Sequence, residues 1–368
     1  MKVLHFYKTY LPDGFAGVER VIWNICESTH AHGVESDVLA LSAAPPPVPL
    51  PVGHHIAHHA SQDLYLASTG LSVSVFAKFA ELARQADIVH FHFPWPMMDL
   101  VNLVVRLRCA TVVTYHSDII KQKTLARLYA PLMHQFLGQM DQIVATSPNY
   151  LESSPVLQRY AAKTSVIPIG IEPLAAPPRP DLLDRWRKAV GEEFFLFVGA
   201  PRYYKGLEFL LGAARQTGLP VVIAGAEEAE IFGVSGHRPG NVHVVGRVND
   251  ADKEALLRLA RAFVFPSHLR SEAFGVALLE AARAGKPMIS CEIGTGTSYV
   301  NLADQTGFVI APQDVAALSE SMQKLANSDV LTTAMGAVAT QRFAAEFTAG
   351  TMGKRYFDLY DRLLKSRN

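Results

Sequence analysis

The sequence is short of the features that mark several large classes of protein. It has three cysteines among 368 residues, Cys26, Cys109 and Cys291. Their odd number and wide spacing argue against a disulfide framework and fit a reducing compartment. Charged residues make up only 18% of the chain, and 34 basic residues balance 34 acidic ones. Neither half has a strong basic excess, so we expect no nucleic-acid partner.

Long hydrophobic runs are also missing. No run approaches the roughly 18 uninterrupted apolar residues that a spanning helix needs. The N-terminal apolar stretch is soon interrupted by His5, Lys8 and Pro12. It is too short for a signal peptide and is typical of a first strand. We therefore expect a cytoplasmic protein, with peripheral contact to a membrane left open.

Apolar residues make up 49% of the chain, which indicates a globular protein long enough for two domains. Strand-like apolar runs alternate with helical patterns throughout. This alternation predicts an α/β protein with parallel sheets covered by helices and right-handed crossovers. The predicted strands lie at 2–7, 36–41, 87–93, 110–116, 141–147 and 164–170 in the first half, and at 194–200, 220–226, 241–247, 262–267 and 287–290 in the second.

A proline-rich stretch, residues 170–186, separates two complete series of strands and helices. We place the hinge between two domains there. The predicted domains are residues 1–172 and 185–345. They are followed by a helix at 346–368 that can pack back on the N-terminal domain, because its apolar residues share one face.

Two carboxylates stand out in the segment SEAFGVALLEAARAGKPMIS, residues 271–290. Glu272 precedes Gly275, which we place near the start of a helix, and Glu280 follows in its second turn. The start of a helix is an anion site, and ionised carboxylates beside it can accept hydrogen bonds from sugar hydroxyls. The alternative is structural: Glu272 favours the helix dipole and Glu280 forms a surface ion pair.

The same segment closely resembles the E-x7-E motif of family-four retaining glycosyltransferases. The resemblance implies the GT-B fold, in which two Rossmann-like doubly wound domains face each other across a cleft. It implies that Glu272 contacts the hydroxyls of the donor sugar and Glu280 the ribose of the nucleotide. The helix start, with Gly275, Val276 and Ala277, is expected to contribute to the donor site. No metal is implied, since basic residues and helix dipoles hold the diphosphate.

Residues 197–213, FVGAPRYYKGLEFLLGA, resemble the family's G-R-x-x-x-x-K-G loop. That loop supplies an arginine and a lysine to the donor diphosphate, where cations stabilise the leaving nucleotide. Lys205 matches the lysine, whereas Ala200 occupies the arginine position. Arg202 could reach the phosphates instead, or be an ordinary surface charge. Arg270 is a further basic candidate.

Residues 10–25 resemble the family's N-terminal glycine loop, in which glycines let the backbone approach phosphates and acceptor. Gly17 matches the second glycine, and Ala16 replaces the first. Glu19 is equally consistent with a first-turn helix residue and with an acceptor contact. His116 follows a predicted strand and matches a family histidine that lies near the donor sugar, where it could hydrogen-bond the sugar or orient the acceptor.

His90 and His92 point to one face of their predicted strand. A metal site is conceivable there, but no third ligand is apparent, so we favour packing around the acceptor loop. The histidine-rich residues 53–60 are interpreted as a solvated strand and loop. Residues 294–301 only superficially resemble a phosphate loop. In related transferases this loop borders the donor cleft, which makes Gly296 a candidate contact.

Residues 116–138 carry Lys121, Lys123 and Arg127 together with apolar residues at helical spacing. We interpret them as a helix packed on its own sheet. The alternative is a helix that faces anionic lipid at a membrane surface.

The stretches HFYKTYLPD, YHSDIIKQK and RSEAFG resemble bacterial O-antigen and capsule transferases that use GDP-mannose or GDP-D-rhamnose. This resemblance implies a nucleotide-sugar donor and a lipid-linked saccharide acceptor at the inner membrane. Two other functions stay open. One is a sugar-nucleotide epimerase of the same fold. The other is a catalytically degenerate nucleotide-sugar-binding subunit, which Ala200 would favour.

Overall fold

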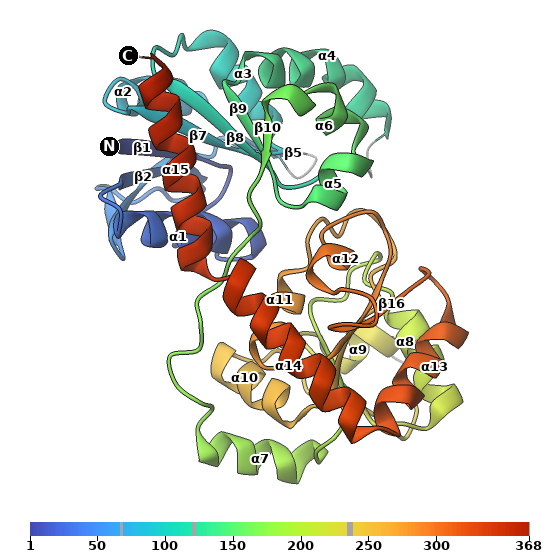
Figure 1. Cartoon of the computed structure of the whole chain (residues 1–368). Coiled ribbons are helices and arrows are strands. Elements are labelled where there is room, and N and C mark those ends of the chain that lie inside the picture. Colours follow the sequence, from blue (N-terminus) through green and yellow to red (C-terminus); the bar gives the residue numbers. More distant parts are fainter. Residues whose placement is uncertain (67–68, 120–122, 234–237, 368) are drawn as a thin grey trace. The chain divides into compact units, whose positions relative to one another are not determined.

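A computed structural model describes the chain except for residues 67–68, 120–122, 234–237 and 368, and for residues 123–126 it describes the backbone only (Figure 1). The chain divides into two compact units, one formed by residues 1–172 with 348–368 and the other by residues 173–347. The first unit is therefore completed by residues that follow the second unit in sequence.

The first unit is built on an eight-stranded sheet in the order β10-β9-β8-β7-β1-β2-β4-β3. Its strands pair in parallel except for β3 with β4 at one edge. They are β1 (Lys2–Phe6), β2 (Glu35–Ser42), β3 (Leu50–Val52), β4 (His55–Ser61), β7 (Ile88–Phe93), β8 (Ala110–Tyr115), β9 (Gln142–Ala145) and β10 (Thr164–Val166), with β5 (Leu64–Leu66) and β6 (Thr69–Leu71) forming a separate antiparallel pair.

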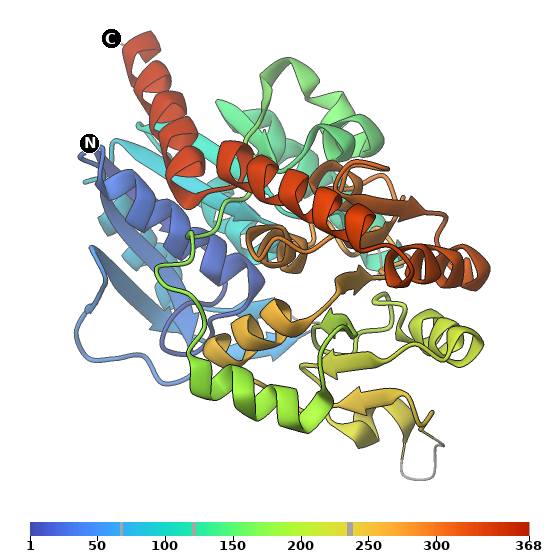
Figure 2. The same cartoon turned by 60° about the horizontal axis from the view of Figure 1, so that its bottom comes forward.

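Helices cover this sheet, so its central strands are buried on both faces and read as continuous apolar runs. Every residue of β7 and β8 is buried. The helices are α1 (Gly17–His30), α2 (Ser74–Ala83), α3 (Pro96–Val104), α4 (Lys123–Gln139), α5 (Pro148–Ser153), α6 (Pro155–Arg159) and α15 (Ala349–Arg367), with a short 3-10 helix at Ala161–Lys163. Helix α15 lies beside α1, as both views of the chain show (Figures 1 and 2).

The second unit contains a six-stranded parallel sheet in the order β13-β12-β11-β14-β15-β16. Its strands are β11 (Phe195–Val198), β12 (Val221–Ala224), β13 (Val242–Val244), β14 (Ala262–Phe265), β15 (Met288–Cys291) and β16 (Gly307–Ile310). Its helices are α7 (Pro180–Val190), α8 (Leu207–Thr217), α9 (Glu228–Phe232), α10 (Asp250–Leu259), α11 (Val276–Arg283), α12 (Thr297–Val300), α13 (Val315–Ala326) and α14 (Asp329–Glu346).

The predicted alternation of strands and helices is confirmed in both units, but three local predictions are wrong. Residues 180–186 are not a linker, because Pro180 starts helix α7. The strand β16 was missed. The histidine-rich residues 53–60 are solvated only in part, because β4 lies between β2 and β3 and buries His55 and His59, whereas His54 and Ile56 are exposed. The rings of His55 and His59 bond the Tyr10 hydroxyl and the Leu11 carbonyl, each at 2.8 Å.

Each sheet has a point where the strand order reverses, between β1 and β7 in the first unit and between β11 and β14 in the second. Ligands of doubly wound folds bind beyond the carboxyl ends of the strands at such a switch point. The loops that follow these strands are therefore where a site is expected. Among the described residues, no helix combines the length and the apolar character that crossing a membrane requires.

Candidate active site

Two predicted site residues meet at the switch point of the second sheet. Lys205 follows β11 and Glu272 follows β14, and the Lys205 ammonium forms a short ion pair with the Glu272 carboxylate. The ammonium also lies over the ring of Phe265, 4.5 Å from its centroid. The Lys205 and Glu272 side chains are 14% and 13% exposed. The pair is thus screened from water and interacts more strongly than a surface pair.

Helix α11 begins directly after this pair. Gly275 occupies the left-handed region with φ of +85°, where a Cβ atom would lie 3.0 Å from Leu278 Cδ1. No side chain of the described residues caps the helix. The amides of Val276 and Ala277 lack intrahelical acceptors because they are the first of the helix. Glycine therefore lets the chain turn from Glu272 into a helix start that is open to an anion.

Glu280 lies in the second turn of α11, as predicted, and is paired with a lysine that sequence reasoning missed. Lys253 on α10 places its Nζ 2.6 Å from Glu280 Oε1 and 2.9 Å from Asp250 Oδ1. Burial alone would lower the pKa of Lys253, but Glu280 and Asp250 outweigh it and raise that pKa. The ion pair of Glu280, which the structural alternative placed at the surface, is therefore largely buried. Nothing in the sequence links residues so far apart.

The remaining candidates of this unit differ in their surroundings. Arg202 is exposed in the turn before Lys205, and no described residue forms an ion pair with it. Arg270 donates a hydrogen bond to the Gly294 carbonyl at 2.8 Å, which ties the loop after β14 to the loop after β15. A Cβ atom on Gly296 would lie 2.5 Å from the Phe274 ring. Close packing therefore requires glycine at 296.

In the first unit, the loop after β1 leads to Gly17, the first residue of α1. No described atom lies within 4 Å of the position that a Cβ on Gly17 would take, so packing does not require glycine there. Glu19 is buried and accepts a short hydrogen bond from the Thr9 hydroxyl. Glu19 therefore fastens the loop to the helix, in agreement with its interpretation as a helix residue.

His116 follows β8 at the carboxyl edge of the first sheet. Its amide donates to the Phe93 carbonyl at 3.0 Å, and its side-chain Nε2 lies 3.0 Å from Nδ1 of His92. Burial lowers the pKa of His116 to about 3, so its imidazole is neutral near pH 7.

Three buried histidines lie together beneath His116, and their geometry does not fit a metal ion. His5 joins His90 and His92, so the third histidine that the sequence did not reveal comes from β1. The rings of His90 and His92 are stacked with centroids 4.4 Å apart, and those of His5 and His92 are stacked within 24°. Stacked rings direct their lone pairs alongside one another, whereas metal ligands converge on one point. Both nitrogens of His90 already bond hydroxyl groups, those of Tyr360 and Thr114.

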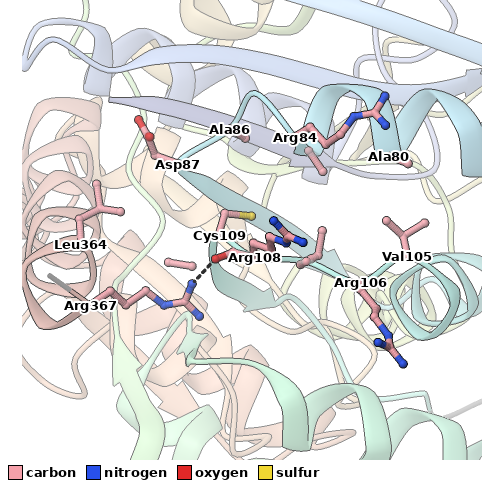
Figure 3. Close-up of a pocket in the computed structure, with 13 residues that line it drawn as sticks. Ala80, Arg84, Ala86, Asp87, Val105, Arg106, Arg108, Cys109, Leu364 and Arg367 are labelled. Atoms are coloured by element: carbon pink, nitrogen blue, oxygen red, sulfur yellow. Dashed lines mark hydrogen bonds between the residues drawn. The ribbon is translucent and has the colours of Figure 1, made fainter.

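A cavity of about 710 Å³ lies at the opposite edge of the first sheet, where the chain enters β7 and β8 (Figure 3). None of the predicted site residues lines it. Figure 3 shows the guanidinium groups of Arg84 and Arg106 pointing away from each other, while Arg367 bonds the Arg108 carbonyl at 3.0 Å. The arginines therefore do not converge on a common ligand.

The fold is that of known glycosyltransferases. Sucrose-phosphate synthase from Thermosynechococcus elongatus matches with a TM-score of 0.81 at 19% identity, over 99% of both chains. Together with the two parallel sheets, this match assigns the chain to the GT-B class, as the sequence predicted.

Sequence comparison gives the family. Residues 15–173 match Glycosyltransferase Family 4, and residues 179–342 match Glycosyl transferases group 1. D-rhamnosyltransferase WbpZ of Pseudomonas aeruginosa is 52% identical over 95% of this chain and 93% of its own. O-antigen chain mannosyltransferase C of Escherichia coli is 45% identical over the full length of both chains. The chain belongs to the family-four glycosyltransferases and is an enzyme. Neither the epimerase nor the degenerate subunit is favoured, since both relatives are named as transferases.

Proposed function

We propose that this enzyme transfers a D-mannosyl or D-rhamnosyl group from a GDP-sugar to a lipid-linked saccharide of bacterial O-antigen, at the cytoplasmic face of the inner membrane. The supporting observation is the likeness, over nearly the whole chain, to a D-rhamnosyltransferase and an O-antigen chain mannosyltransferase at 52% and 45% identity. Family resemblance supports transfer with retention of configuration.

The donor would be held by the second unit. Glu280 accepts hydrogen bonds from the ribose, and Glu272 accepts them from the sugar hydroxyls. The diphosphate lies against Lys205 and the amides of Val276 and Ala277. There positive charge and free N–H groups stabilise the negative charge that develops as the glycosidic bond breaks. The exposed Arg202 is free to reach the phosphates in place of the arginine that is absent at Ala200. Because these groups supply the positive charge, we propose that no metal is needed.

The acceptor would be bound by the first unit, near Gly17 and His116. The leaving phosphate oxygen would take the proton of the attacking hydroxyl, so no protein carboxylate is required as a nucleophile. Within α4, Met133 and Phe136 are buried, which supports a helix packed on its own unit. Arg127 and Leu128 are exposed, and these would meet anionic lipid in a peripheral membrane contact. Lys121 lies outside the described residues.

A panel of nucleotide sugars tests the donor. A ligand that binds the folded state raises the melting temperature by mass action. We expect GDP, GDP-mannose and GDP-D-rhamnose to raise the melting temperature, and UDP and ADP sugars at the same concentration to leave it unchanged. A shift with UDP or ADP sugars alone would replace the proposed donor, and no shift with any nucleotide at millimolar concentration would remove the donor site itself.

Lys205→Ala tests the site. We expect sugar transfer to fall roughly 100-fold or more, because one preorganised charge on the leaving group is lost. Arg215→Ala is the matched control, since it removes an exposed cation at the far end of α8 and should leave transfer unchanged. Equal activities of the two variants in a radiolabelled-sugar assay would contradict the assignment of Lys205.

A further inference from the structure

A chain of three histidines runs from the core of the first unit to His116. His5 Nδ1 lies 3.1 Å from His92 Nε2, and His92 Nδ1 lies 3.0 Å from His116 Nε2. His5 and His92 are fully buried, and His116 is 7% exposed. The three rings come from the adjacent strands β1 and β7 and from the residue that follows β8. The chain therefore connects a predicted site residue to the interior of the sheet.

When all three histidines are neutral, their rings have only two possible arrangements of protons. Each neutral imidazole carries one N–H donor and one acceptor nitrogen, so choosing the donor in one bond decides the donor in the next. In the first arrangement all three rings are protonated on Nδ1, and each bond donates from the core toward His116. In the second all three are protonated on Nε2, and each bond donates inward toward His5.

The inner end of the chain distinguishes these arrangements. His5 Nε2 is buried and has no hydrogen-bond partner among the described residues. The inward arrangement places an unpaired N–H group there, whereas the outward arrangement leaves only an unpaired lone pair. Unpaired N–H groups are rarer in protein interiors than unpaired acceptors. The inner end therefore favours the outward arrangement.

The outer end is compatible with the same arrangement. His116 Nδ1 is not one of the buried unpaired atoms of the described part of the chain. An N–H group at this position can donate to water or to a ligand, so the outward arrangement leaves no donor unpaired. It also gives His116 a defined chemical form, an uncharged ring whose remaining nitrogen is a donor.

We propose that His5 and His92 are positioning residues that hold His116 in the Nδ1-protonated tautomer, so that His116 presents a neutral N–H donor to an oxygen atom of the saccharide acceptor. The inference rests on the proposed function for its ligand, and on the first unit alone for its geometry. Burial lowers the pKa of His5 and of His116 to about 3, which keeps these two imidazole rings uncharged at neutral pH.

The tautomers can be read directly from ring nitrogens. We would label the full-length enzyme with ¹⁵N-histidine and record long-range ¹H–¹⁵N correlation spectra at pH 7, with peaks assigned by their loss in single variants. Spectra of His5, His92 and His116 protonated on Nδ1 would support the proposal. Protonation of His116 on Nε2 in the wild-type enzyme would overturn it.

Substitutions of two neighbouring histidines distinguish a role in positioning His116 from a general effect on folding. His92→Phe removes the donor to His116, whereas His90→Phe removes an equally buried histidine that bonds Thr114 and Tyr360 instead. We expect His92→Phe to release the His116 tautomer and to lower kcat/KM roughly tenfold, and His90→Phe to do neither. His92→Asn retains an amide N–H near the Nδ1 position and should restore part of both. Identical behaviour of the two Phe variants would overturn the positioning role.

The spectra keep this inference separate from the proposed function. They require no substrate, so they decide the tautomer even if no GDP-sugar is turned over. If the thermal-shift panel fails while His116 is protonated on Nδ1, the donor is wrong and the histidine arrangement stands. If His92→Phe does not fold, the wild-type and His92→Asn spectra still decide the outcome.

Discussion

At the scale of single residues, both acids of the E-x7-E motif are paired with a lysine from elsewhere in the second unit. Glu272 pairs with Lys205, and Glu280 pairs with Lys253. A nearby cation favours the ionised carboxylate, which is an acceptor only and so suits hydroxyl groups. In the proposed donor site the lysines would thus favour hydroxyl recognition by the two carboxylates, without having to contact the sugar or the ribose.

Replacing Lys253 tests this role. Lys253→Gln leaves Glu280 largely buried without its cation, so we expect GDP to bind roughly tenfold more weakly in isothermal titration calorimetry. Asp250→Asn is the control, because it alters the other carboxylate that Lys253 contacts and leaves Glu280 paired. Unchanged GDP affinity in Lys253→Gln would show that the pair only stabilises the fold.

The sequence could predict some of these residues and not others, for a physical reason. Lys205, Glu272 and Glu280 belong to motifs in which the spacing along the chain fixes the geometry. Lys253 and His5 reach their partners across strands and helices that are distant in sequence, and only the fold brings them together. Their types carry no signal of their own, since a lysine in a helix and a histidine in a strand are ordinary.

At the scale of elements, the start of α11 depends on one backbone conformation. Gly275→Ala would place a β-carbon in the left-handed region and close to Phe265 and Leu278. We expect it to lower the free energy of unfolding by about 1 kcal/mol or more and to weaken GDP binding, because the first amides of the helix would shift. Urea denaturation and calorimetry measure the two effects.

Gly218→Ala is the matched control for this substitution. Gly218 has φ of +68° at the end of α8, and nothing described lies within 4 Å of its virtual Cβ. It should lose similar stability through strain while keeping nucleotide affinity. Loss of GDP binding in both variants would indicate that general destabilisation, rather than the helix start, explains the effect.

Helices and strands were predicted well where the apolar pattern was long, and poorly where packing against the rest of the unit decided whether a segment was buried. The helices α1, α8, α10 and α11 and most strands follow their apolar periodicity. Four-residue β16 begins with glycine and is half-buried over its last three residues, so its pattern is weak. The histidine-rich run of β4 resembles no site and predicts a solvated strand, yet His55 and His59 are buried. Here they are satisfied inside by Tyr10, Glu27 and a carbonyl group.

At the scale of the whole molecule, buried neutral histidines make stability depend on pH. Burial lowers the pKa of His5 and His116 to about 3 and lowers those of His90 and His92 well below the ordinary 6.5. Below pH 6.5 these histidines bind protons in the unfolded protein but stay neutral in the folded protein. Each such histidine therefore contributes stability that is complete above pH 6.5 and is lost, by about 1.4 kcal/mol per pH unit, as the pH falls toward the folded pKa.

We expect the urea midpoint of unfolding to fall steeply between pH 6.5 and pH 4. In His90→Phe the midpoint should depend less steeply on pH, because the contribution of one buried histidine is removed. The comparison of wild type with variant cancels the contribution of the carboxylates. If the two slopes coincide, His90 is protonated in the folded protein as readily as in the unfolded one.

The last helix gives the molecule an unusual vulnerability. Tyr356 and Tyr360 of α15 bond Thr114 and His90, so α15 completes the interior of the unit that residues 1–172 form. That interior therefore cannot close before residues 348–368 have been synthesised. A protease that removed α15 would expose the interior of the first unit and leave every strand of the second unit in place.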